Sequence, residues 1–146
     1  MTFYLVLAAL AGVGLAFQAV INARLGAALN SSIWAALVQV FVGLVLLFVC
    51  LALVRQPLPS LAGAARLPWW IWAGGMLGSA YVLTMIIITR PLGAALAAGA
   101  VIVGQMVAAL VIDHYGWFGV ESQRLSPLRV TGVILLLLGA VLIRWK

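Results

Sequence analysis

Acidic residues, histidine and cysteine are almost missing from this chain of 146 residues. It contains two acids, one histidine and one cysteine, and only 7% of its residues are charged, whereas soluble domains carry about 25%. A single cysteine cannot form a disulfide within the chain, and one histidine with one cysteine cannot furnish a metal site. HExxH, GxSxG and repeated acidic motifs are also missing. We therefore expect neither enzyme activity nor a cofactor.

Five long apolar segments take up most of the sequence, in which 67% of the residues are hydrophobic. A helix needs about 20 mostly apolar residues to cross a bilayer core of about 30 Å. The predicted helices cover about 3–21, 33–54, 69–89, 92–112 and 128–145. The last is the weakest, because Arg129 and Arg144 must extend their side chains to the membrane surface.

The backbone of a chain in lipid must satisfy its own polar groups, which only helices and closed barrels achieve. The alternating pattern of a barrel is missing. The sequence therefore predicts an all-α, multi-pass membrane protein with one transmembrane domain over residues 1–146.

The basic residues divide equally between the two faces of such a five-helix bundle. The face of the N-terminus receives Arg55, Arg66, Arg124 and Arg129, and the other face receives Arg24, Arg90, Arg144 and Lys146. Orientation ordinarily follows an excess of Lys and Arg in the cytoplasmic loops, and here there is none. We therefore expect insertion in both orientations and pairing of two opposite copies as an antiparallel homodimer. The alternative is that a partner protein or one dominant helix fixes the orientation.

The net charge of +6 does not indicate a nucleic-acid partner. The basic residues are scattered singly at the helix ends, without a cluster or stripe. This arrangement is typical of residues that anchor helices in a bilayer.

Amide side chains are the most informative interruptions of the apolar segments. Gln18 and Asn22 are four residues apart and share a helix face, which Gly14 extends. Gln39 lies between two small residues at the same spacing, and Gln105 shares a row with the acid at the end of the fourth helix.

An amide that faces lipid has no partner, so these groups should point into the bundle or into a hydrated cavity. In a structural interpretation they bridge helices, with a contribution of about 0.6–2 kcal/mol each. In a functional interpretation they contact a solute. The predicted substrate-binding residues are Gln18, Asn22, Gln39 and Gln105, with Tyr81 and Trp34 as aromatic walls.

Several glycines are candidates for close helix packing. Gly74 and Gly78 form a GxxxG pattern, for which packing is favoured over a hinge. The predicted packing residues are Gly14, Gly74, Gly75, Gly78 and Gly104.

Asp113 and His114 are the candidate residues for proton or ion coupling. A carboxylate in a membrane bundle can exchange a proton for a cation, and an imidazole can titrate near neutral pH. The competing and favoured interpretation places Asp113 at the membrane surface, paired with Arg124 or Arg129.

Three stretches combine these amides, tryptophans and glycines: QAVINARLGAALNSSIWAALVQVFVG, PWWIWAGGMLGSAYV and RPLGAALAAGAVIVGQMVAALVIDHYG. Through them the chain resembles the YdcZ-type family of the drug/metabolite transporter superfamily, which is distantly similar to the small multidrug resistance family. The resemblance implies a bacterial inner-membrane protein that pairs with itself, or with a similar small paralogue, to imitate a ten-helix transporter. Small multidrug resistance proteins carry a carboxylate deep in the first helix, and this chain has none there.

The function we expect from these features is transport of a small polar or amphipathic organic solute by alternating access. The alternatives are a non-transporting subunit for membrane assembly or stabilisation, and one half of a heterodimeric transporter.

Overall fold

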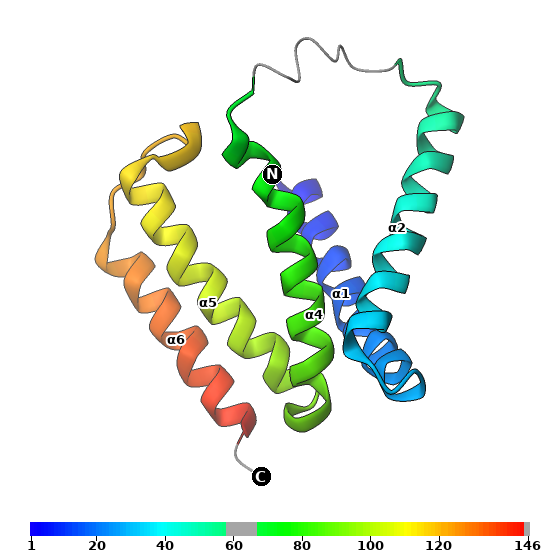
Figure 1. The fold of residues 1–146 in the computed structure, drawn as a ribbon. Coiled ribbons are helices and arrows are strands. Elements are labelled where there is room, and N and C mark those ends of the chain that lie inside the picture. Colours follow the sequence, from blue (N-terminus) through cyan, green and yellow to red (C-terminus); the bar gives the residue numbers. More distant parts are fainter. Residues whose placement is uncertain (58–66, 145–146) are drawn as a thin grey trace. The chain divides into compact units, whose positions relative to one another are not determined.

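The computed structural model describes residues 1–57 and 67–144, and all the regular secondary structure of these residues is helical (Figure 1). The elements in order are α1 (Thr2–Ala28), α2 (Ser32–Val54), the 3-10 helix η1 (Trp69–Trp72), α4 (Ala73–Leu92), α5 (Ala94–Tyr115), the 3-10 helix η2 (Trp117–Gly119) and α6 (Pro127–Arg144). Five helical segments are long and apolar enough to cross a membrane, with η1 and α4 forming one of them. The predicted all-α, multi-pass architecture is confirmed.

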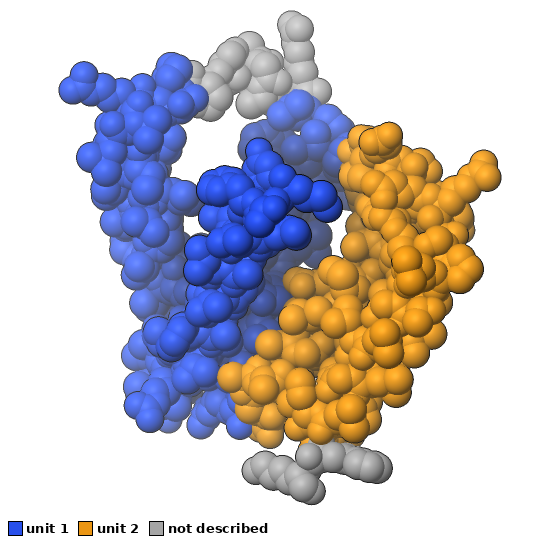
Figure 2. All heavy atoms as spheres, turned by 180° about the vertical axis from the view of Figure 1, so that it is seen from behind, with its two compact units in different colours: residues 1–90 blue, residues 91–146 orange. Residues whose placement is uncertain are grey.

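The chain divides into two compact units (Figure 2). Unit 1 is Met1–Arg90, with α1, α2, η1 and nearly all of α4. Unit 2 is residues 91–146, with α5, η2 and α6. One transmembrane domain over the whole chain, as half of a ten-helix assembly, stays a prediction.

The connection between α1 and α2 is a tight turn. α1 continues past the predicted end at Ile21 to Ala28, and Asn30 adopts a left-handed conformation with φ of 49°. The Ser31 hydroxyl oxygen then accepts a hydrogen bond from the Trp34 N–H at 3.2 Å, which satisfies a free donor at the start of α2.

The turn between α4 and α5 lies at Gly93, later than residues 90–91, which separate the two predicted helices. α4 continues through Pro91 to Leu92, although a proline disfavours helix in the residue before it. Gly93 has a φ of 79°, which glycine adopts without steric cost. A proline near the last turn of a helix is thus tolerated, and the glycine reverses the chain.

The later helix ends also differ from the prediction by a few residues. α5 continues to Tyr115, where Gly116 ends it in a left-handed conformation. α6 begins at Pro127, after Ser126, whose hydroxyl accepts the Arg129 N–H at 3.3 Å. Residue 145, the predicted end of the last helix, lies outside the described residues.

The core of unit 1 lies at one end of its three long helices. A Cβ added at Gly26 would lie 3.0 Å from Cγ2 of Ile86 and 3.7 Å from Cβ of Ala35. We call these three residues the packed node; all are buried, and Ile86 is 0% exposed. The other buried residues of this end are Ala19, Asn22, Ala23, Met85 and Thr89. From this end α2 diverges from α1 (Figure 1).

Unit 2 is a helical hairpin held by small residues. A Cβ added at Gly99 of α5 would lie 3.3 Å from Cβ of Ala140 on α6. Ala140 and Ala97 are the buried apolar residues of this unit among those described. Small side chains let the two backbones approach closely, as in other membrane helix pairs.

Candidate functional site

The packed node gives a common reference point from which positions along the three long helices of unit 1 can be compared. α1 and α4 run in the same direction, and α2 runs opposite to both (Figure 1). Four residues advance about 6 Å along a helix and return to nearly the same face. One such step from the node reaches Asn22 on α1, Gln39 on α2 and Val82 on α4. We call these three residues the amide level.

A second step of four residues reaches Gln18, Gly43 and Gly78. Two glycines at this level leave space beside the glutamine side chain. Asn22 and Gln39 thus lie at the first step from the packed node, and Gln18 lies at the second step.

Burial falls steadily along the three rows away from the node. Asn22 is 7% exposed, Gln39 and Gln18 are half-buried, and Gly78 is exposed. Oε1 of Gln39 is buried and has no hydrogen-bond partner among the described residues. A buried polar atom without a partner costs about 1–3 kcal/mol, so this oxygen is suited to accept a hydrogen bond from a molecule that enters the bundle.

An apolar groove lies between α2 and α4 of unit 1. It has a volume of about 300 Å³ and is lined by Ile33, Ala36, Leu37, Val40, Ser79, Ala80 and Leu83. Val40 follows Gln39 and Leu83 follows Val82, so on each helix the residues of the amide level lie on a neighbouring face and are not part of the groove lining.

The structure does not bring all of the predicted substrate-binding residues together. Gln105 is exposed on α5 of unit 2, and Trp34 is 60% exposed at the start of α2. Tyr81 is half-buried on α4, beside Val82 of the amide level. A binding role for each of these residues stays a prediction.

The predicted packing glycines have free space around them in the described part of the chain. A Cβ added at Gly14, Gly74, Gly75, Gly78 or Gly104 would meet no heavy atom within 4 Å. Their packing role stays a prediction. Within the helices, the glycines in close contact are instead Gly26 and Gly99.

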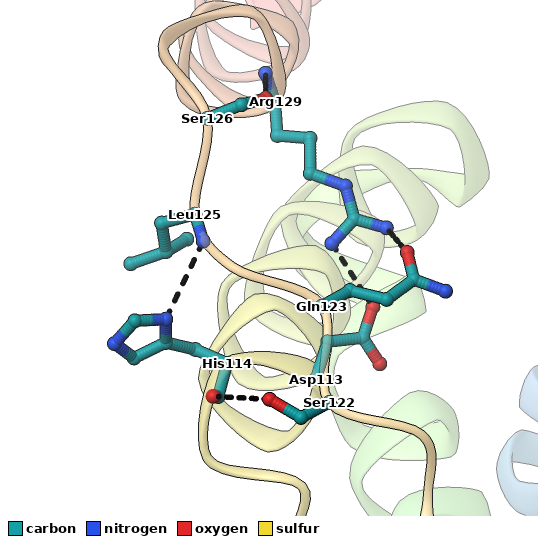
Figure 3. Close-up of polar contacts among 7 residues, drawn as sticks. All are labelled: Asp113, His114, Ser122, Gln123, Leu125, Ser126 and Arg129. Carbon is teal, nitrogen blue, oxygen red and sulfur yellow. Dashed lines mark hydrogen bonds and ion pairs between the residues drawn. The ribbon is translucent and has the colours of Figure 1, made fainter.

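Asp113 lies at the end of α5 in a polar cluster of unit 2 (Figure 3). Its Oδ2 is 3.5 Å from Nη1 of Arg129, one of the two arginines expected as its partner. Arg129 also donates from Nη2 to Oε1 of Gln123. The Gln123 N–H donates to the Asp113 carbonyl oxygen at 2.8 Å. The cluster thus ties the loop after η2 to both helices.

His114 holds the same loop through two hydrogen bonds (Figure 3). Its Nδ1 accepts the Leu125 N–H at 3.4 Å, and its carbonyl oxygen accepts the Ser122 hydroxyl at 3.1 Å. Nδ1 can accept only while it carries no proton, so protonation there would break the contact with Leu125. Proton or ion coupling by Asp113 or His114 stays a prediction.

Thr89 is a polar residue that the sequence analysis missed. It is 7% exposed on α4, and its hydroxyl oxygen has no hydrogen-bond partner among the described residues. Thr131 on α6, by contrast, donates to the Pro127 carbonyl at 2.8 Å. Thr89 lies three residues after Ile86 and therefore shares its helix face. The sequence alone does not show that this face packs against α1.

Two comparisons with known proteins find matches among inner-membrane proteins. Residues 3–142 match the model of a family described as "Putative inner membrane exporter, YdcZ". The chain is 31% identical over 138 residues to the inner membrane protein YdcZ of Escherichia coli (strain K12), a match that covers 91% of this chain and 89% of that protein. No solved structure matches the chain.

Proposed function

Because this chain belongs to the YdcZ family, we propose that it moves a small polar or amphipathic organic solute by alternating access. It is a multi-pass protein of the inner membrane, and its family indicates a transporter rather than an enzyme. The observation that carries the finer proposal is the amide level, in which the buried Gln39 oxygen has no hydrogen-bond partner among the described residues.

The position of this level suits an alternating-access site. Transporters commonly bind their substrates near the middle of the bilayer, between helices that rearrange around a fixed site. Asn22 and Gln39 lie one helical turn from the packed node, and the rows beyond them become progressively exposed. A site that is packed on one side and open on the other corresponds to one of the two states that such a cycle requires.

The second part of the proposal is an antiparallel homodimer. Four basic residues on each predicted face leave no charge bias, so both orientations can insert. The free space at Gly74, Gly75 and Gly78 of α4 would let a helix of a second copy approach closely. A similar small paralogue could occupy the same place, as one half of a heterodimer.

A topology experiment tests the dimer. A reporter at the C-terminus that is active only in the cytoplasm is compared with one that is active only outside the inner membrane. We expect both to give signals, because both orientations insert. Signal from one reporter alone would refute insertion in two orientations and favour a fixed partner.

A flux experiment tests transport. Purified protein is reconstituted in liposomes, and the release of polar and amphipathic solutes is followed for the unmodified chain and for Gln18→Ala, Asn22→Ala and Ile21→Ala. Ile21 is on the same helix but outside the row and 62% exposed. We expect flux, reduced by the two amide substitutions and kept by Ile21→Ala. Without flux for any solute, and with effects of the amide substitutions on folding alone, the non-transporting subunit becomes the better interpretation.

A further inference from the structure

The amide level offers hydrogen bonds of both kinds to a bound molecule. Asn22 is 7% exposed, and the Gln39 oxygen is buried without a partner among the described residues. An amide side chain carries one acceptor oxygen and two N–H donors, and it can turn either group toward a ligand. Hydroxyl, amide and carboxylate groups would all find a complementary partner here.

Unit 1, in which this level lies, contains no acidic side chain. Residues 1–90 include four arginines, Arg24, Arg55, Arg66 and Arg90, and neither Asp nor Glu. A cation that leaves water for the interior of a bundle loses its hydration and needs an opposite charge as compensation. Unit 1 has no such charge to supply, and its own charges repel a cation.

The two acids of the chain, Asp113 and Glu121, both belong to unit 2. Asp113 is paired with Arg129 of the same unit at 3.5 Å, so its charge is already balanced. Glu121 is exposed in the loop after η2. Neither acid is a free carboxylate buried within a helix bundle.

From these observations we infer that the site, if it transports as proposed above, selects against positive charge and takes uncharged or anionic amphipathic molecules. The polar group of such a molecule hydrogen-bonds to Asn22 and to the unpaired Gln39 oxygen. Asn22 and Gln39 are then the residues that determine charge selectivity.

Replacement of a side-chain amide by a carboxylate tests this inference. Gln39→Glu and Asn22→Asp keep the size of the side chain and add the missing negative charge. Gln56→Glu is the matched control, because Gln56 is exposed in unit 1 and lies outside the rows. The probes are benzamide, benzoate and benzyltrimethylammonium, which share a ring and differ in charge. Binding is measured through the shift of the unfolding temperature in detergent, at alkaline pH so that the introduced carboxyl is ionised.

We expect the unmodified chain to bind benzamide or benzoate at least about tenfold more tightly than the cation. Gln39→Glu or Asn22→Asp should raise the affinity for the cation at least about tenfold and lower that for benzoate, whereas Gln56→Glu should change neither. Preference of the unmodified chain for the cation overturns the inference. So does a gain in cation affinity that Gln56→Glu reproduces, or no gain in either amide variant although it folds.

The two proposals fail in different ways. A chain that binds in the expected order of charge but moves no solute in liposomes contradicts the proposed transport and leaves the charge selectivity standing. A chain that moves the cation faster than benzamide and benzoate supports transport and overturns the selectivity.

Discussion

The packed node can be tested by adding one methyl group at Gly26. In Gly26→Ala the new Cβ lies 3.0 Å from Cγ2 of Ile86, closer than carbon atoms normally approach. Ile86 is fully buried, and its branched side chain has little rotamer freedom within a helix, so it cannot easily move away. Such overpacking costs about 1–3 kcal/mol. Alanine gains about 1 kcal/mol over glycine in a helix interior. We expect a net loss of up to about 2 kcal/mol in the free energy of unfolding.

A double-mutant cycle isolates this contact. Ile86→Ala alone should cost about 2–5 kcal/mol, because it removes a buried side chain. It also removes the Cγ2 that meets the added methyl group. In the Ile86→Ala background, Gly26→Ala should therefore become neutral or stabilising, by up to about 1 kcal/mol. The change of sign is the specific expectation.

The assay is reversible denaturation in detergent micelles, followed by the helical circular dichroism signal. Gly12→Ala, on the same helix, is the matched control, since a Cβ added there meets no described heavy atom within 4 Å outside the neighbouring backbone of α1. If Gly26→Ala is as harmless as Gly12→Ala in the unmodified background, α1 and α4 do not approach at Gly26, and the levels derived from this contact are wrong.

Three further predictions concern the other parts of the molecule. Arg129→Met removes the side chain that pairs with Asp113 and Gln123, so we expect faster hydrogen exchange in the loop before α6. The loss of stability should stay below about 1 kcal/mol, since the ion pair is partly exposed, and unchanged exchange would refute this role. Gly99→Ala should weaken the α5–α6 hairpin by about 1 kcal/mol through its contact with Ala140, whereas Gly104→Ala should leave the monomer unchanged, and equal effects in thermal unfolding would contradict the close approach. Gln56→Lys and Leu29→Lys add charge to opposite faces, so they should shift C-terminal reporters toward opposite orientations; a shift in the same direction would argue against charge balance.

The number and approximate extent of the helices could be predicted from the sequence, because hydropathy depends only on neighbours along the chain. Local chemistry was also readable. Arg129 was one of the two arginines expected to pair with Asp113, and it is the one that does so.

The faces that pack could not be predicted, because a lipid-facing residue and a core residue are equally apolar in a membrane helix. Gly26 and Gly99 make the close contacts, whereas the glycines chosen by pattern have free space in the described chain. The turn lies at Gly93 and not in the gap between the predicted helices 69–89 and 92–112, because α4 continues through Pro91. Thr89 escaped notice for the same reason as Gly26, since its burial depends on which helix lies opposite.

The small size of the packed node has a consequence for how this sequence can drift over evolutionary time. Ile86 is the one large side chain that is completely enclosed among the described residues, while most leucines and valines of α1 and α2 face outward. Outward positions accept any exchange among aliphatic residues, because acyl chains adapt their shape to each of them. Position 26 accepts little beyond a hydrogen atom. Distant homologues of this chain should therefore diverge freely along most of their length. They should still share a few small residues where the first three membrane-spanning helices contact one another.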